Sequence, residues 1–177
     1  LTLIGDEPHR PYDRPPLSKE FLRGEKPQEA LSYEPESFYR EQRIDLALGR
    51  LVRALDPAAK TATLADGETV SFQKALIATG GRPVRLDLPG MGLPGVHVLR
   101  TVEDSAAIAA DARSGRSAVL AGGGFIGLEL AASLTQRGVR VTVIETQPRI
   151  WSRFADVRLA DHVQACCEAR GVAFVTG

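Results

Sequence analysis

Three glycines, Gly122, Gly124 and Gly127, have the spacing G-x-G-x-x-G within the stretch AVLAGGGFIGLELAASL. In such a turn the first glycine permits a tight bend, the second lets the backbone approach a pyrophosphate, and the third lets a helix pack closely on a strand. The N–H groups at the start of the following helix then face the phosphates, at the positive end of the helix dipole. The spacing predicts a dinucleotide-binding turn, with Phe125 and Ile126 beside the nucleotide.

A carboxylate completes this pattern. Glu145 ends the apolar run VTVIE that follows the glycine turn. A carboxylate at the end of the second strand accepts hydrogen bonds from the ribose hydroxyls of NAD and repels the 2′-phosphate of NADP. The positive charge of Arg149 nearby weakens the argument against NADP. We therefore expect a preference for NAD.

The elements that position these residues follow from the periodicity of residues 117–177. Buried strands are predicted over 117–121 and over the valines and isoleucine of 139–144, and a third strand over 172–175. Helices are predicted from the glycine turn to Arg137, with Gly138 just after the end, and over about 155–169. The order β-α-β-α-β is half of a doubly wound parallel sheet.

The segment before residue 117 has a different character. Residues 1–4 are predicted to form a buried strand, a proline-rich ordered loop follows over 8–16, and one short helix is expected over 17–22. A helical turn over 37–42 precedes four predicted strands of an antiparallel meander, at 44–48, 51–55, 61–65 and 69–72, with Asp66-Gly67 as a hairpin turn. A further strand is expected over 75–78, a loop over 82–100, and a helix over 104–113 with Thr101 or Asp104 as N-cap.

Composition excludes several classes of function. The chain has 177 residues, with 22 Lys+Arg against 22 Asp+Glu, so its formal net charge of zero gives no general attraction to nucleic acid or to an anionic membrane. No apolar run is long enough to cross a bilayer, and no secretory signal is present. The only cysteines, Cys166 and Cys167, are interpreted as packing residues of a protein in the reducing cytoplasm. No metal site is expected.

Four stretches carry a family resemblance: HRPYDRPPLSKEFLRG, ALIATGGRP, HVLRTVEDS, and GGGFIGLELAASL with GVRVTVIETQPRIWSR. In this order and spacing they resemble the FAD-dependent NADH:ferredoxin reductases of aromatic-ring dioxygenase and P450 systems. The resemblance implies an α/β fold of nested Rossmann-like FAD and NAD domains, both incomplete here. Residues 1–112 would be part of the FAD domain with its small β meander, and residues 113–177 the first part of the NAD domain. Both chain ends lie in strand-like segments, which is expected of a piece of a longer protein.

The resemblance also implies roles for single residues. Asp6 or Glu7 would hold the FAD ribose, Val52 would offer backbone groups to the adenine, and Thr79 and Gly80 would lie where the chain passes the FAD. Arg14 and Lys19 would lie along the flavin, Arg100 would approach the flavin or its phosphates, and Glu129 would lie near the nicotinamide and pair with Lys19. Lys19 and Glu129 are the expected catalytic pair. Taken alone, Glu129 is a lone helical acid of the kind usually found on a solvated surface.

The resemblance finally implies a partner. Disulfide reductases of related fold carry a cysteine pair near the position of PYDRPPLSK, and this stretch has no cysteine. Electrons are therefore expected to leave the flavin singly, for a [2Fe–2S] ferredoxin. Alternatives are a rubredoxin reductase, an NADH oxidase, or a flavin- and NAD-binding interaction protein similar to apoptosis-inducing factor.

Overall fold

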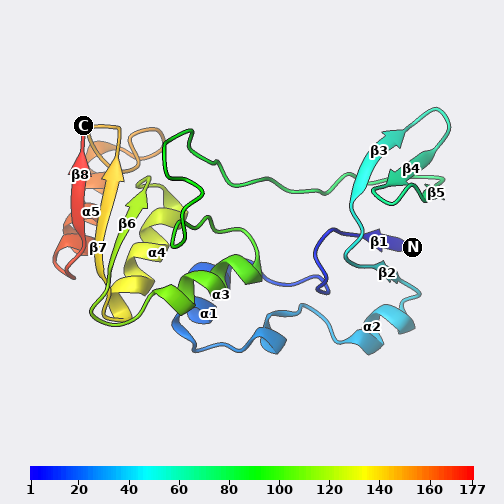
Figure 1. Cartoon of the computed structure of the whole chain (residues 1–177), viewed down its shortest axis with the longest axis horizontal. Coiled ribbons are helices and arrows are strands. Elements are labelled where there is room, and N and C mark those ends of the chain that lie inside the picture. The colour runs from blue at the N-terminus through cyan, green and yellow to red at the C-terminus, as the bar shows by residue number, and fades with distance from the viewer. The chain divides into compact units, whose positions relative to one another are not determined.

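The computed structural model describes residues 1–177, which form two compact units. The first unit contains residues 1–13 and 31–82, and the second contains residues 14–30 and 83–177. Figure 1 shows the elements of both units in chain order. The predicted boundary at residue 112, between an FAD part and an NAD part, stays a prediction.

A parallel pair of strands opens the first unit. β1 (Thr2–Ile4) pairs with β2 (Asp45–Ala47), so that Leu3 lies opposite Leu46. The 3-10 helix η2 (Gln28–Leu31) and helix α2 (Glu36–Glu41), which starts after Pro35, precede β2 in the chain. Leu31, at the end of η2, belongs to this unit.

The prediction that residues 44–48 begin the antiparallel meander was wrong. After β2 the N–H groups of Gly49 and Arg50 bond to the carbonyls of Glu7 and Gly5, at 2.9 and 2.8 Å. The backbone therefore keeps pairing with the segment after β1 instead of turning onto β3. Gly49 has φ +67°, a left-handed conformation that interrupts the extended chain before β3.

The meander itself has three strands, β3 (Val52–Asp56), β4 (Thr61–Leu64) and β5 (Thr69–Ser71), all antiparallel. The predicted Asp66-Gly67 turn joins β4 and β5, and Gly67 has φ +89°. Arg50 clamps the turn by binding Asp66 at 2.7 Å and Glu68 at 2.6 Å. The Glu68 N–H group lowers the pKa of Asp66 most, and the ion pair with Arg50 lowers it further.

The strand expected over residues 75–78 is not formed, and this prediction was wrong. No strand within the described chain lies beside this segment to supply a ladder of hydrogen bonds. Leu76 is 90% exposed and Ile77 is 70% exposed, so the apolar run buries neither side chain. The loop predicted after it, over 82–100, is confirmed.

The second unit contains the predicted β-α-β-α-β series. β6 (Ser117–Ala121), β7 (Arg140–Glu145) and β8 (Ala173–Thr176) are parallel in the order β6-β7-β8. Helix α4 (Phe125–Gln136) joins the first two strands and α5 (Val157–Glu168) joins the last two. Gly138, with φ +78°, follows α4 as predicted. Strand β6 was expected to be buried, but Val119 is 66% exposed because its side chain lies on the sheet face that the described chain leaves uncovered.

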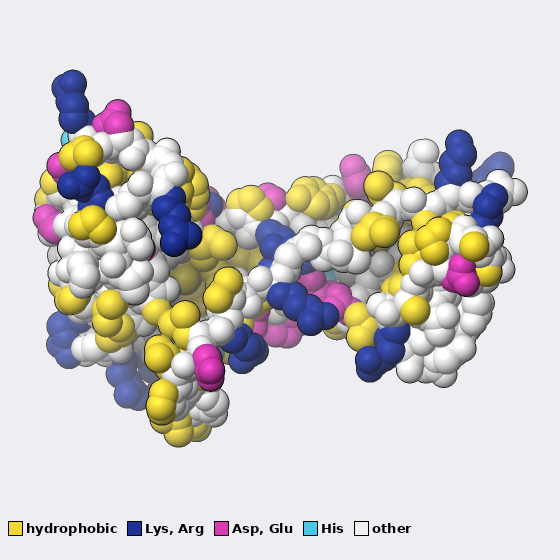
Figure 2. All heavy atoms as spheres, turned by 90° about the horizontal axis from the view of Figure 1, so that it is seen from above, with side chains coloured by type: hydrophobic (Ala, Val, Ile, Leu, Met, Phe, Trp, Pro, Cys, Tyr) yellow, Lys and Arg dark blue, Asp and Glu magenta, His cyan; other side chains and the backbone are white.

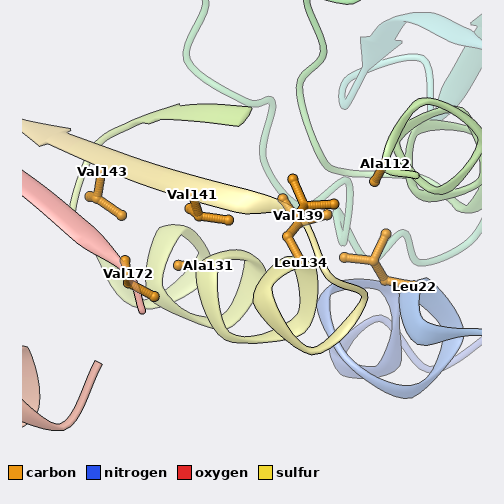
Figure 3. Close-up of a cluster of buried hydrophobic side chains, with 8 residues drawn as sticks. All are labelled: Leu22, Ala112, Ala131, Leu134, Val139, Val141, Val143 and Val172. Atoms are coloured by element: carbon orange, nitrogen blue, oxygen red, sulfur yellow. The ribbon is translucent and has the colours of Figure 1, made fainter. Parts of the chain in front are cut away.

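The core of this unit lies between α4 and β7 and extends to segments before β6. Figure 3 shows Val141 and Val143 of β7 facing Ala131 and Leu134 of α4, with Leu22 close to Leu134. Leu22 belongs to the short helix α1 (Glu20–Arg23) and is fully buried. Leu22, which lies far earlier in the chain, therefore completes the core beside the parallel sheet of β6, β7 and β8.

The helix predicted over residues 17–22 is instead two short helical turns, η1 (Pro15–Ser18) and α1, which are separated at Lys19. Pro15 and Pro16 lack N–H donors, which suits them to the start of a short helical turn. The predicted helix near 104–113 is α3 (Val102–Asp111). Thr101 is its N-cap, as one of the two candidates, and Asp104 completes a capping box with it.

The surface carries side chains of both charges, as the composition indicates, and the two cysteines are not joined by a disulfide. Figure 2 shows exposed apolar side chains among side chains of both charges. Cys166 and Cys167 are free thiols on α5, where Cys167 packs against the core and burial raises its pKa. No helix of the chain has the length and apolar character needed to cross a membrane.

Candidate dinucleotide site

The glycine turn has the geometry that its spacing predicts. Gly122 has φ +106°, a conformation that other residues rarely adopt, and its N–H group donates to the Ile144 carbonyl at 2.8 Å. A Cβ atom on Gly127 would lie 2.1 Å from the Gly122 carbonyl oxygen. Only glycine can therefore let α4 approach the end of β6 this closely.

Gly124 differs from the other two glycines. Its φ of −77° is ordinary, and a Cβ there would meet no protein atom within 4 Å. No side chain caps α4, so the N–H groups of its first turn have no capping partner at Gly124. Open space beside an uncapped helix start fits a pyrophosphate group, which these N–H groups would bind.

Glu145 is tied to this turn. One carboxylate oxygen accepts from the Gly123 N–H at 2.9 Å, and the other accepts from the Gln147 N–H at 3.0 Å. The Gln147 N–H lowers the pKa of Glu145 most, and the Gly123 N–H lowers it further. The half-buried carboxylate is thus held ionised at the carboxyl end of β7, and its oxygens keep lone pairs for hydroxyl donors.

Gly123 is a residue that the spacing rule does not single out. A Cβ on Gly123 would lie 2.8 Å from Ile150 Cγ2 and 3.4 Å from the Glu145 carboxylate. The run of three consecutive glycines in the sequence was the available signal for this requirement. Gly123 therefore makes room for Ile150, which is fully buried, and brings its own N–H to Glu145.

An aromatic cluster adjoins the glycine turn. Phe125, the first residue of α4, stacks on Phe154 with ring centroids 4.7 Å apart, and its centroid lies 5.1 Å from that of Trp151. Phe125 and Ile126 are 59% and 55% exposed. These two residues, which were predicted to lie beside the nucleotide, therefore present apolar surface next to the turn. The prediction from sequence did not include Trp151 or Phe154, because both lie in a loop without periodicity.

Lys19 and Glu129 form an ion pair within the second unit. The Lys19 Nζ lies 2.8 Å from Glu129 Oε2, and each side chain is 35% exposed. The structure thus brings together the two residues expected to pair, from the break between η1 and α1 and from the second turn of α4. Glu129 is therefore not the solvated helical acid that its sequence position suggests when taken alone.

Arg14 and Arg100 also come together. An Arg14 guanidinium N–H donates to the Arg100 carbonyl at 2.6 Å. Asp104 accepts from the N–H groups of Arg100 and Thr101 at 2.8 and 2.9 Å, which fixes the backbone at Arg100. Arg14 and Arg100, the two arginines expected near the flavin, are thus both tied to the short stretch before α3.

The remaining predicted residues lie in the first unit: Asp6, Glu7, Val52, Thr79 and Gly80. Asp6 and Glu7 follow the carboxyl end of β1, the position at which a carboxylate in a parallel sheet can hold a ribose. Glu7 accepts a hydrogen bond from the Tyr12 hydroxyl, a contact absent from the sequence-based expectation. Val52 begins β3, and Thr79 and Gly80 lie in the extended segment after the meander.

The class of protein follows from these features: parallel strands, a glycine turn and a carboxylate at the end of the following strand are the features of a dinucleotide-binding fold. The family model for pyridine nucleotide-disulphide oxidoreductases matches residues 1–177. The chain belongs to that family.

Known proteins resemble the chain over nearly its whole length. The probable ferredoxin reductase CtmF of Castellaniella defragrans is 45% identical over 177 residues, which are 100% of this chain and 43% of that protein. A rubredoxin-NAD(+) reductase of Pseudomonas putida is 39% identical, over 98% of this chain and 45% of its own length. In the crystal structure of the covalent putidaredoxin reductase–putidaredoxin complex, one chain matches with a TM-score of 0.91 and 31% identity, over 99% of this chain and 43% of that one. The chain thus spans less than half the length of these proteins.

Proposed function

We propose that the chain is part of a flavoprotein oxidoreductase that passes electrons from NADH through FAD to a small [2Fe–2S] ferredoxin, which serves a ring-hydroxylating dioxygenase or a P450. FAD accepts a hydride and releases electrons one at a time. The observation that carries the proposal is the glycine turn with Glu145, because it combines an uncapped helix start, open space at Gly124 and an ionised acid at the ribose position.

In this proposal the residues of the second unit bind NADH. The N–H groups at the start of α4 bind the pyrophosphate, and Glu145 accepts hydrogen bonds from the ribose hydroxyls. Phe125 and Ile126, which are exposed beside the turn, exclude water from the bound dinucleotide. Because the Glu145 carboxylate is ionised, it repels a 2′-phosphate, so NADH is the preferred coenzyme.

The first unit binds FAD with Asp6 or Glu7 at the ribose, backbone groups of Val52 at the adenine, and Thr79 and Gly80 along the cofactor. The position of Asp6 and Glu7 just after the carboxyl end of β1, a strand in a parallel pair, supports this assignment. Arg14 and Arg100 supply positive charge toward the flavin or its phosphates. The hydrogen bond from Arg14 to the Arg100 carbonyl supports a fixed orientation for the Arg14 guanidinium, and Asp104 fixes the backbone from which Arg100 extends.

Lys19 is proposed to act as a fixed cation at the flavin. Negative charge that develops there in the transition state is stabilised most by a cation already held in place. The 2.8 Å ion pair with Glu129 supports this role because it limits the conformations of a long side chain. Glu129 in turn is proposed to lie near the nicotinamide.

A second candidate acceptor is rubredoxin, because a rubredoxin reductase is 39% identical to the chain. The test uses the full-length protein loaded with FAD. Its NADH-dependent reduction of a [2Fe–2S] ferredoxin is compared with that of a rubredoxin, and oxygen consumption without carrier is the control. A kcat/KM at least tenfold higher with ferredoxin supports the first proposal. A preference for rubredoxin supports the second, and oxygen reduction alone contradicts both.

A further inference from the structure

Three serine hydroxyls surround the backbone that carries Lys19. Ser105 on α3 is 0% exposed and donates to the Leu17 carbonyl at 2.6 Å. Ser133 on α4 is 1% exposed and donates to the Ser18 carbonyl, also at 2.6 Å. Two different helices thus hold the two carbonyls that immediately precede Lys19.

These two bonds leave the segment little freedom. A buried carbonyl that lost its donor would be costly, so the backbone at Leu17 and Ser18 has one favourable arrangement. Arg23 reinforces it by donating to the Ser133 hydroxyl at 3.2 Å. Lys19 therefore extends from a backbone whose position is set by α3 and α4.

The third hydroxyl acts on the partner of Lys19. The Ser18 Oγ lies 2.5 Å from Glu129 Oε2 and 3.2 Å from the Pro15 carbonyl. A serine hydroxyl has one proton to donate, and a charged acceptor at the shorter distance is the stronger site. The proton therefore goes to Glu129, on the same oxygen that binds Lys19.

We propose that Ser18 is a positioning residue, which holds the Glu129 carboxylate in the orientation that fixes Lys19, while Ser105 and Ser133 hold the backbone that presents both side chains. The significance of this network for catalysis rests on the proposed function, in which Lys19 is the cation at the flavin. The orientation itself is a property of the chain and can be measured without turnover.

The experiment measures how readily the Lys19 amine reacts. The full-length, flavin-loaded protein without NADH is treated briefly with acetic anhydride, and acetylation of Lys19 is quantified by mass spectrometry relative to Lys26, for which the structure shows no ion pair. In Ser18→Ala the carboxylate loses one of its two donors and rotates more freely. The acetylation of Lys19 relative to Lys26 is expected to rise about threefold, because the Lys19 amine loses part of its charge-assisted hydrogen bond to Glu129.

Three variants accompany this measurement. Ser18→Thr keeps the hydroxyl and is expected to restore the ratio of the unmodified protein. Ser133→Ala frees the Ser18 carbonyl and is expected to raise the ratio as well, which keeps the test decisive if Ser18→Thr folds poorly. Ser117→Ala removes an exposed serine at the opposite end of β6 from the glycine turn, and should leave the ratio unchanged.

The outcomes separate the two proposals. An unchanged ratio in Ser18→Ala, or an equal rise in Ser117→Ala, overturns the positioning role. A raised ratio together with a lower limiting rate of flavin reduction, at unchanged NADH affinity, supports the network as a means of positioning Lys19. If the ratio rises but Lys19→Met reduces the flavin at the normal rate, the network stands and the role of Lys19 at the flavin fails.

Discussion

The Glu145 carboxylate accepts a hydrogen bond from the Gly123 N–H at 2.9 Å, so the acid at the end of β7 and the glycine turn are one connected structure. The connection has two requirements. Gly123 must lack a side chain, since a Cβ would lie 2.8 Å from Ile150, and Glu145 must be ionised to accept from two N–H groups. If Glu145 selects the coenzyme as proposed, that choice is coupled to the shape of the turn.

Replacing Glu145 tests the coenzyme preference. In the full-length enzyme, Glu145→Ala is expected to reduce the preference for NADH over NADPH, because the mutation removes both the ribose acceptor and the repulsion of a 2′-phosphate. The expected change is about 1–3 kcal/mol in relative kcat/KM. The control is Glu168→Ala, which removes an exposed acid of α5. Equal efficiency with both coenzymes in the unmodified enzyme would falsify the assignment.

The same residue predicts a pH effect on stability. The pKa of folded Glu145 is lower than its ordinary value of 4.5, so its contribution is fully present above about pH 4.5 and is lost as pH falls through the lowered value. Glu145→Gln is expected to destabilise the protein by about 1 kcal/mol near neutral pH, and by progressively less in acid. Urea unfolding at a series of pH values measures this. A difference between the two proteins that stays constant down to strongly acidic pH contradicts it.

The glycines make a matched pair of tests. Gly127→Ala forces a Cβ to within 2.1 Å of the Gly122 carbonyl, and is expected to destabilise the protein by about 3 kcal/mol or more. Gly124→Ala meets no protein atom, so about 1 kcal/mol or less is expected, with a large loss of NAD binding. Thermal unfolding and NAD titration separate the two effects. If Gly124→Ala binds NAD normally, no phosphate lies at that glycine.

Lys19 is tested at the chemical step. Lys19→Met is expected to slow the limiting rate of flavin reduction at saturating NADH more than it weakens NADH binding, because a fixed cation acts on charge that develops in the transition state. Lys26→Met, in the same segment, is the control. Stopped-flow absorbance of the flavin gives both quantities. An unchanged limiting rate removes Lys19 from the reaction.

Arg137 is expected to matter for stability alone. Its guanidinium donates to the carbonyls of Leu22, Ala109 and Ala112, with the Ala109 contact at 2.7 Å. Arg137→Lys cannot bind three carbonyls in one plane, so a loss of about 2 kcal/mol in unfolding free energy is expected. Arg140→Lys, at an exposed site on β7, is the control. Equal stabilities of the two variants would show that the three bonds contribute nothing.

The sequence was most informative where a single spacing determines the structure. The glycine turn and the strand ending at Glu145 depend on local geometry and are found as predicted, and the helix cap is Thr101, one of the two predicted candidates. The partner of β2 was mispredicted because strand pairing depends on segments far apart in the chain. The expected strand at 75–78 failed for the same reason, since an apolar run needs a neighbouring strand that composition cannot supply.

The candidate site shows the same division. The Lys19–Glu129 contact was expected only from the family resemblance, since no local pattern relates residues so far apart in the chain. Ser105 and Ser133 had no sequence signal at all, because serine is common and their partners here are backbone carbonyls from another element. Long-range contacts of this kind become visible only when the helices are in place.

Because residues 14–30 belong to the second unit, they should unfold locally together with it. These residues stand between two stretches of the first unit in the chain, yet Leu22 is buried against α4. Amide hydrogen exchange should therefore show two interleaved levels of protection along the sequence. The amides of α1 should be protected to the same degree as those of α4. The amides of β1 and β2, which precede and follow α1 in the chain, should show a different degree of protection. A substitution that loosens α4 would then increase deuterium uptake at Leu22, while uptake at Leu3 and Leu46 stays constant.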